Sequence, residues 1–382
     1  MNRASKSCHI CGKSGVISRA ISVCVSCIRE GKDEIYNIAQ KVHRRVREVY
    51  GLPPEPPKDP DGIPCAVCSN RCVIGQGRMG YCGLRMNDQG KLHSLSKPDR
   101  AIYYAYLDPH ITNCCAAWFC PAGTGLGYPR FARRRGPEYG YYNLAIFFYG
   151  CNFDCLFCQN SSHKDLHAEP QHSMHDLIDR TLNNDKITCW CFFGGSPEPQ
   201  LPFAINTSRK LLETIHRDRV MRICFEWNGC GNSHLVRRAA EISYLTGGNI
   251  KFDLKCWDEN LSYILCGVSN KVAYKNFEMI ANEFKIDGDH PPVLCATTLL
   301  VPGYVDEVEV ENISKFIAGI DPQIPYSLLI FHPDFVMNDL PITPFEQTVK
   351  CYKVARKYLQ NVYIGNLHLL GFRSMNEFLS SI

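Results

Sequence analysis

The sequence predicts an α/β protein: a partial (β/α)6 barrel of the TIM type with an N-terminal Cys-rich metal-binding extension. Strand-like and helix-like runs alternate from residue 142 onward, short polar motifs follow the strand-like runs, and closely spaced Cys pairs precede residue 85. We expect four segments in chain order. They are a zinc-ribbon-like module plus a helix over 1–50, a Pro-rich linker over 51–64, a second Cys-rich module over 65–140, and the barrel over 141–382.

The alternation from residue 142 carries the barrel prediction. Repeated strand–helix units predict a parallel sheet covered by helices, with the loops after the strands at one rim. Ser173 with Asp176 is typical of a capping box, and Pro344 suits a first helical position. Residues 98–140, rich in Gly, Pro, Tyr and Arg, are expected to be irregular. The strand-like runs are 143–149, 188–193, 220–226, 250–254, 293–301, 326–331 and 361–365, and the helix-like runs include 33–49, 201–216, 233–245, 271–284, 306–319 and 344–359.

The amino-acid composition limits the classes of protein to which the chain can belong. The 382 residues are 45% apolar and 21% charged, which is typical of a globular chain, and a net charge of +4 is too small to predict nucleic-acid binding. We find no apolar stretch of membrane-spanning length and no signal peptide, so we expect a cytoplasmic protein with no membrane contact. In that compartment 22 cysteines predict metal sites rather than disulfides, and an anaerobic or strongly reducing setting.

The most informative motif follows the first strand-like run of the barrel. Cys151, Cys155 and Cys158 form a Cys-x3-Cys-x2-Cys run. Three thiolates on one tight loop can hold a 4Fe-4S cluster by three irons and leave the fourth without a protein ligand, and an open position is typical of a catalytic metal centre. A zinc knuckle or three buried thiols are the alternatives.

With its aromatic residue Phe157, this run resembles the signature of the radical S-adenosylmethionine superfamily. The resemblance implies an oxidoreductase that cleaves S-adenosylmethionine reductively to methionine and a 5′-deoxyadenosyl radical. The loop after the second strand resembles the superfamily's Gly-Gly-Glu-Pro loop, which binds the methionyl amino group. It departs from that loop in having Ser where Glu is expected, and it comprises Gly194, Gly195, Ser196, Pro197 and Glu198.

Later motifs resemble the glycyl-radical enzyme activases, the pyruvate formate-lyase activating enzyme branch. They are Asp253-Leu-Lys255, Gly267-Val-Ser-Asn270 and Val301-Pro-Gly-Tyr304. The resemblance implies that Asp253 and Lys255 hold the carboxylate and ribose of S-adenosylmethionine, with Glu226 and Asn228 as further ribose or methionyl contacts. A buried structural ion pair is the alternative for Asp253 and Lys255. The implied substrate is a protein or peptide, and the implied partner a low-potential electron donor such as ferredoxin or flavodoxin.

Two Cys quartets precede the barrel. The first has the spacing of a paired knuckle, for which tetrahedral zinc is the expected occupant and a rubredoxin-like iron or a cluster the rival; it comprises Cys8, Cys11, Cys24 and Cys27. The second resembles an N-terminal element of other radical S-adenosylmethionine proteins and would accept zinc or an auxiliary Fe–S cluster; it comprises Cys65, Cys68, Cys72 and Cys82.

Other cysteines and histidines lie outside these motifs. Three thiols could complete an auxiliary site or stay reduced near the substrate: Cys114, Cys115 and Cys120. Cysteines within strands and helices are expected to behave as small apolar residues: Cys189, Cys191, Cys224, Cys266, Cys295 and Cys351. The segment with His163, His167, His172 and His175 is expected to face solvent, with a metal or cobalamin ligand there as an alternative.

Two other functions stay open. One is a radical C-methyltransferase acting on a protein, with cobalamin as an added cofactor. The Asp-x-His-x-x-Gly cobalamin signature is missing: Asp108 and His110 begin one, but Asn113 stands at the Gly position. The other is a non-enzymatic zinc-binding scaffold, against which the intact three-Cys loop and the Asp-Leu-Lys motif argue.

Overall fold

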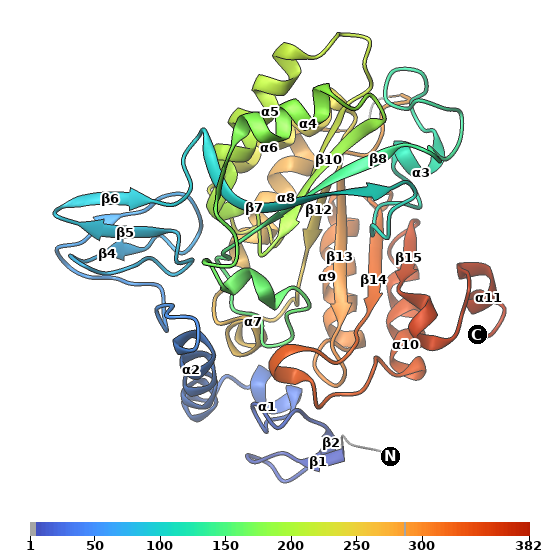
Figure 1. Cartoon of the computed structure of the whole chain (residues 1–382). Helices are drawn as coiled ribbons and strands as arrows, with labels where there is room; N and C mark the ends of the chain where they lie inside the picture. The colour runs from blue at the N-terminus through green and yellow to red at the C-terminus, as the bar shows by residue number, and fades with distance from the viewer. Residues whose placement is uncertain (1–4, 286–287) are drawn as a thin grey trace.

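One mixed sheet of nine strands organises the computed structural model, which describes residues 5–285 and 288–382 (Figure 1). The strand order is β15-β14-β13-β12-β11-β10-β8-β7-β9. Neighbours from β15 to β8 pair in parallel, whereas β7 pairs antiparallel with β8 and β9. The parallel strands are β8 (Tyr142–Phe148), β10 (Ile187–Gly194), β11 (Arg222–Trp227), β12 (Ile250–Asp253), β13 (Leu294–Leu300), β14 (Tyr326–Ile330) and β15 (Val362–Gly365).

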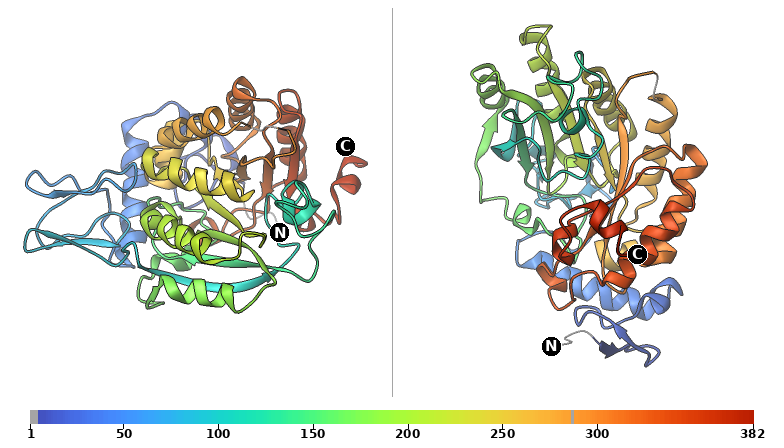
Figure 2. Two further views of the ribbon diagram at one scale, coloured as in Figure 1. Left: turned by 90° about the horizontal axis from the view of Figure 1, so that it is seen from above. Right: turned by 90° about the vertical axis from the view of Figure 1, so that its right-hand side faces the viewer.

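Helices between these strands form a continuous outer layer (Figure 2). Neighbouring helices contact in the order α4, α5, α6, α8, α9 and α10, the same order as the strands that they connect. Their bounds, with those of the short α7 and α11, are α4 (Met174–Leu182), α5 (Leu201–Thr214), α6 (Ser233–Thr246), α7 (Glu259–Cys266), α8 (Lys271–Glu283), α9 (Glu307–Ile320), α10 (Phe345–Arg356) and α11 (Met375–Leu379).

The two faces of the sheet differ because successive side chains of a strand point to opposite sides. The helix-facing side is an aromatic core, in which the ring centroids of Phe148 and Phe192 lie 5.5 Å apart and those of Phe192 and Phe225 lie 5.2 Å apart. The buried Trp190 on this side donates from its indole nitrogen to Thr181 of α4 at 2.8 Å. Such contacts fix the register, so the alternate positions of the same strands face the interior of the barrel.

The predicted strands and helices are confirmed, with small shifts at their ends. Six strand–helix units, from β8 to α10, are followed by the last parallel strand β15. The two edges of the sheet, β15 and β9, do not pair with each other within residues 5–285 and 288–382, so the barrel stays open, as a partial barrel does. Ser173 caps α4 with Asp176 as predicted. Pro344, however, is the residue before the first helical position of α10, because its ψ of 141° is not helical.

The prediction of irregular structure over 98–140 is wrong for its first part. β7 (Arg100–Pro109) is a ten-residue strand that pairs with β8 from Tyr103↔Phe148 to Pro109↔Tyr142, and β9 (Gln171–Ser173) covers its first residues. The sheet therefore reaches back across the expected boundary at residue 141. The strand was missed because it is stabilised by pairing with β8 and β9, which are distant in sequence, and local composition does not reveal such pairing.

The N-terminal extension lies against one end of the barrel. It contains β1 (Ser5–Ser7), β2 (Ser14–Val16), α1 (Val25–Arg29) and α2 (Asp33–Glu48), and both helices contact α7. Two small antiparallel pairs then project from the barrel (Figure 1). These are β3 (Ile63–Pro64) with β4 (Val73–Ile74), and β5 (Arg85–Asp88) with β6 (Lys91–Ser94). Within the described residues, no helix is both long and apolar enough to cross a membrane.

Candidate active site

The three-Cys loop leaves the carboxyl end of β8 and turns into the barrel mouth. Cys151 and Cys155 are buried and Cys158 is half-buried. Among the described residues, the groups of ligand atoms lying within 4.8 Å of one another do not include these three thiols. A single ion would need the sulfurs at such a spacing, whereas a cube of iron and sulfide holds its cysteines farther apart. The three sulfurs as they lie therefore do not converge on one zinc ion.

A buried carboxylate inside this loop anchors it to the N-terminal extension. Asp154 is fully buried, and its carboxylate lies 2.7 Å from Nδ1 of His43 and 3.5 Å from the guanidinium of Arg47, both on α2. It also pairs with the Lys164 ammonium. Burial alone would raise the pKa of Asp154, but the His43 hydrogen bond and the charges of Lys164 and Arg47 hold it below its ordinary range.

The loop after β10 forms the opposite wall by close backbone approach. A Cβ on Gly195 would lie 2.4 Å from the carbonyl oxygen of Gly150 and 2.8 Å from the ring of His163, so only glycine fits there. Gly194 has φ +110°, a conformation that side chains disfavour. The two glycines therefore let the loop after β10 pack directly against the three-Cys loop.

Ser196 and Glu198 bind the end of β11 through hydrogen bonds. The Asn228 amide donates to the Ser196 hydroxyl at 2.9 Å and to Asn152 Oδ1 at 2.8 Å, and the Gly229 amide donates to Glu198 at 2.7 Å. Ser196 donates to the Glu198 carboxylate. Burial raises the pKa of Glu198 to about 7. Glu198 and Pro197 lie behind the wall rather than in it, because neither lines the cavity.

Asp253 and Lys255 lie at the carboxyl end of β12, where they form an ion pair. The Lys255 ammonium is 5.8 Å from the ring centroid of Phe157. Burial would lower the pKa of Lys255, but Asp253 and Cys155 raise it well above its ordinary value. A permanent positive charge therefore stands beside the three-Cys loop, where it can compensate thiolates or receive a carboxylate.

These walls enclose one cavity of about 140 Å³. It collects most of the residues predicted for the site, from the three-Cys loop and from the ends of β10, β11 and β12. Its wall includes Cys151, Cys155, Phe157, Cys158, Gly194, Gly195, Ser196, Glu226, Asn228, Asp253 and Lys255.

His163 also lines this cavity, and sequence reasoning missed it. The expectation that it faces solvent is wrong: its exposed fraction is 3%, and its Nδ1 has no hydrogen-bond partner. Burial lowers its pKa to about 3, so the imidazole is neutral. His167 and His175 are exposed as expected, and His172 is half-buried. His163 differs because the 3-10 helix η1 (Ser161–Lys164) folds back beneath Gly195.

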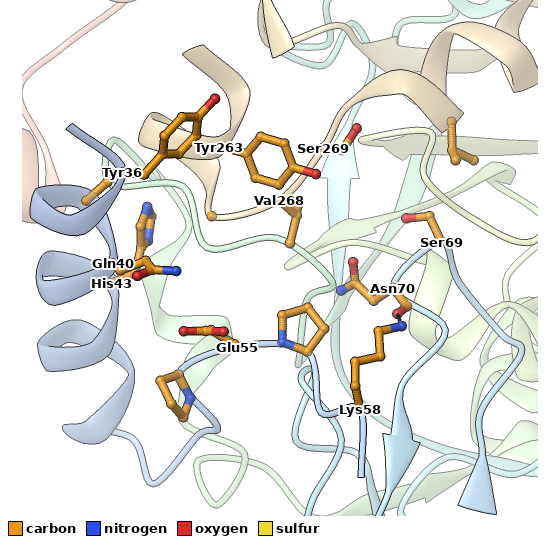
Figure 3. A pocket seen from close by; sticks show the side chains of 15 residues that line it. Tyr36, Gln40, His43, Glu55, Lys58, Ser69, Asn70, Tyr263, Val268 and Ser269 are labelled. Carbon is orange, nitrogen blue, oxygen red and sulfur yellow. Dashed lines mark hydrogen bonds between the residues drawn. The ribbon is translucent and has the colours of Figure 1, made fainter. Parts of the chain in front are cut away.

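A larger cavity, of about 360 Å³, lies on another face (Figure 3). Tyr36, Gln40 and His43 of α2 line one side, and residues after α7 line the other. No cysteine contributes to its wall. We therefore place the chemistry in the smaller cavity, where the three thiols, the ion pair and the glycine loop meet.

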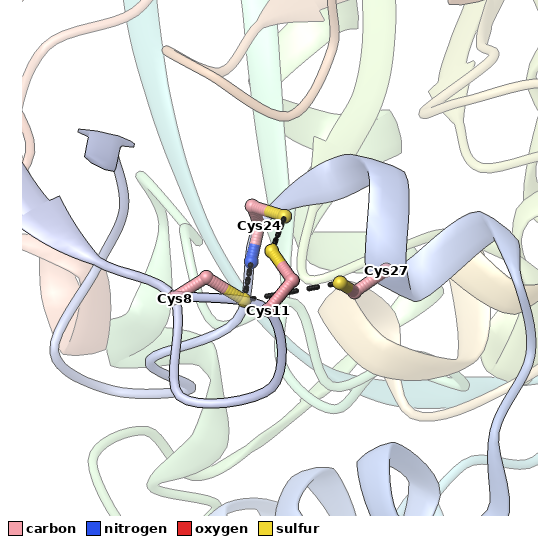
Figure 4. A group of neighbouring side chains, drawn as sticks. All are labelled: Cys8, Cys11, Cys24 and Cys27. Carbon is pink, nitrogen blue, oxygen red and sulfur yellow. Dashed lines mark hydrogen bonds between the residues drawn. The ribbon is translucent and has the colours of Figure 1, made fainter. Parts of the chain in front are cut away.

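The first Cys quartet converges as predicted (Figure 4). The sulfurs of Cys8 and Cys27 are 3.9 Å apart, those of Cys11 and Cys24 are 3.8 Å apart, and all four lie within 4.8 Å of one another. This spacing suits one tetrahedral ion. Arg29, two residues after Cys27, anchors the module to α9 through ion pairs with Asp306 and Glu309 at 2.6 and 2.8 Å.

The second quartet has a different geometry. Cys68 and Cys72 are buried and the Cys65 amide donates to the Cys72 carbonyl at 2.7 Å, but the four sulfurs are not among the single-ion groups found in the described residues. Burial, followed by the neighbouring Cys82 and Cys65, raises the pKa of Cys72 to about 11. Both zinc and an auxiliary cluster stay open as predictions for this module.

Comparison with known proteins agrees with this geometry. Residues 145–317 match the model of the Radical SAM superfamily. Two Methanocaldococcus jannaschii proteins, each provisionally named a glycyl-radical enzyme activating enzyme, are similar to this chain. One is 28% identical over 57% of this chain and 79% of its own length, and the other is 23% identical over 59% and 90%.

A solved domain of a pyruvate-formate lyase-activating enzyme from Bacteroides vulgatus covers 46% of this chain and 98% of its own, with 18% identity and a TM-score of 0.37. The superfamily match spans β8 to α9, the part of the chain that carries the three-Cys loop and the Asp253–Lys255 pair. The chain is a radical SAM enzyme, with its superfamily match over residues 145–317.

Proposed function

We propose that this enzyme cleaves S-adenosylmethionine reductively and abstracts a hydrogen atom from a protein or peptide substrate. One observation carries the proposal: the three-Cys loop and the polar ends of β10, β11 and β12 meet in a single cavity. A 4Fe-4S cluster on that loop would supply the electron that breaks the sulfonium bond.

The chain's own side chains would bind and orient the cofactor. Lys255 presents a charged donor to the methionyl carboxylate, and Asp253 accepts from ribose hydroxyls. Gly194 and Gly195 offer backbone groups without steric bulk. The half-exposed Glu226 carboxylate is a further acceptor for an ammonium or a hydroxyl.

The protein or peptide substrate is inferred from the relatives, whose names describe activation of glycyl-radical enzymes. The electron must come from outside the chain, and we propose a low-potential ferredoxin or flavodoxin as its donor. For the first Cys quartet we propose structural zinc, because four converging thiolates fold a module too small to form its own core.

Anaerobic turnover tests the proposal. Protein incubated with S-adenosylmethionine and dithionite should form 5′-deoxyadenosine, and Cys155→Ala should form none. The matched control is Cys351→Ala, a buried cysteine of α10 outside the cavity, which should retain activity. Product formation by Cys155→Ala at the wild-type rate would refute the proposal. S-adenosylhomocysteine as product would favour methyl transfer, and a colourless protein containing only zinc would favour a scaffold.

A further inference from the structure

The barrel interior beneath the cavity is lined by thiols. Barrels of this kind usually fill their interior with Val, Ile and Leu. Here Cys189 and Cys224 have their sulfurs 3.5 Å apart, and Cys191 lies 3.1 Å from the ammonium of Lys251. Lys251 has an exposed fraction of 2%. These cysteines are buried as expected from the sequence, but Cys191 contacts a buried charge.

A separate segment, residues 114–118, packs against the first residues of β14 and β15 and brings two more thiols. Trp118 donates from its indole nitrogen to Ser327 at 3.0 Å and stacks on Tyr363 at 5.4 Å. Ser327 in turn donates to the Cys115 carbonyl at 2.8 Å. Because β14 and β15 hold the segment at these points, the adjacent Cys114 has a fixed position, with its sulfur 3.3 Å from the Lys251 ammonium.

Cys114, Cys115 and Glu226 each place a ligand atom within 4.8 Å of the other two. The first quartet satisfies the same spacing. The three groups come from two segments about a hundred residues apart, so the fold rather than the local chain brings them together. Glu226 also lines the cavity beside the three-Cys loop, and its carboxylate lies 3.5 Å from the Lys251 ammonium.

The charges balance around one divalent ion. Two thiolates and a carboxylate carry three negative charges, and the buried Lys251 supplies one positive charge. A divalent cation would bring the sum to zero, which matters because Lys251 is buried and uncompensated charge beside it is costly. Thiolate ligands favour ions such as Zn²⁺ and Fe²⁺ over Mg²⁺ or Ca²⁺.

We propose that Cys114, Cys115 and Glu226 hold one thiophilic divalent ion, zinc or ferrous iron, in the barrel beneath the S-adenosylmethionine cavity. Three protein ligands leave a coordination position for a substrate atom, as catalytic sites do. Since Glu226 borders both spaces, the ion would lie where a substrate entering the cavity could reach it. The site shares Glu226 with the proposed cofactor cavity, but its argument rests on the convergence of Cys114, Cys115 and Glu226 and not on hydrogen abstraction or on the first Cys quartet.

Cobalt binding to the full-length protein tests the site. The background variant is Cys151→Ala, Cys155→Ala and Cys158→Ala, which removes the cluster loop as a source of thiolates. Each protein is stripped of metal with a chelator and then dialysed anaerobically to equilibrium against Co²⁺. When Cys114→Ser and Cys115→Ser are added to the background variant, the amount of cobalt bound should decrease by one ion per chain. Cys351→Ser in the same background is the control and should bind as the background does. If the double variant and the control bind the same amount of cobalt per chain, the proposal is overturned.

Two further measurements keep the test decisive if the double variant misfolds. Glu226→Gln keeps both thiols and should weaken cobalt affinity at this site at least tenfold, so wild-type affinity would also overturn the proposal. Anaerobic alkylation followed by mass spectrometry should find Cys114 and Cys115 reduced and protected by metal. A disulfide between them in native protein would refute the site. Metal analysis of the protein as isolated then distinguishes zinc from iron.

Discussion

Replacing Asp154 by Asn should destabilise the enzyme by about 3–5 kcal/mol, the usual cost of removing one partner from a buried ion pair. The substitution keeps the size of the side chain but removes its charge. Arg47 retains other partners, since its guanidinium donates to the carbonyl oxygens of Pro53 and Tyr81. Lys164 has an exposed fraction of 1% and loses its ion-pair partner, so the cost arises mainly there.

Urea unfolding of anaerobic protein at pH 7, followed by tryptophan fluorescence, measures this cost. With an m-value of about 3 kcal/mol/M, the midpoint should fall by about 1–1.7 M. The control is Asp218→Asn, whose side chain is 91% exposed. That change should alter the free energy of unfolding by no more than about 0.5 kcal/mol. Iron content should also fall in Asp154→Asn, because the residue holds the three-Cys loop.

The effect should depend on pH in a defined direction. The folded-state pKa of Asp154 is depressed, so its stabilisation is present above the unfolded pKa of about 3.9 and is lost as pH falls below it. The difference between wild type and Asp154→Asn should therefore shrink on acidification from pH 5. A midpoint shift below about 0.3 M at pH 7, equivalent to under about 1 kcal/mol, would refute the assignment of Asp154 as an anchor.

Three other predictions concern separate parts of the molecule. Burial raises the pKa of Glu198 to about 7, so stability from its bound proton is present below about pH 4.3 and lost as pH rises through 7. The free energy of unfolding of Glu198→Gln, relative to that of wild type, should therefore rise by about 3 kcal/mol between pH 4 and pH 8 in urea unfolding. A difference between the two proteins that does not change with pH would contradict this. Lys255→Met should weaken S-adenosylmethionine binding about 10- to 100-fold, because a charged hydrogen bond contributes about 1.5–3 kcal/mol. Anaerobic calorimetry measures this affinity, and an unchanged value would show that Lys255 does not bind the cofactor. Cys27→Ser should release one metal ion per chain by elemental analysis and expose the N-terminal module to limited proteolysis, whereas full metal content would show that Cys27 is not a ligand.

Local sequence was sufficient for most secondary structure and for the main chemical motif. The strands β8 and β10–β15 were predictable because their apolar runs are short, β-rich and separated by helical periodicity. The three-Cys loop and the first quartet were predictable because metal ligands on one turn require fixed spacings. The polar residues at strand ends could be assigned to one rim because parallel strands share a direction.

Tertiary structure alone decided which distant side chains meet. The pairing of Asp154 with His43 joins residues 111 positions apart, and no local pattern predicts it. His163 enters the cavity only because η1 turns beneath Gly195, and Glu198 points behind the wall because the Gly229 amide binds it there. The Cys114, Cys115 and Glu226 group depends in the same way on the segment that packs against β14 and β15. Spacing along the chain determines local geometry, whereas contacts across the fold depend on strand register and packing, which only the folded molecule fixes.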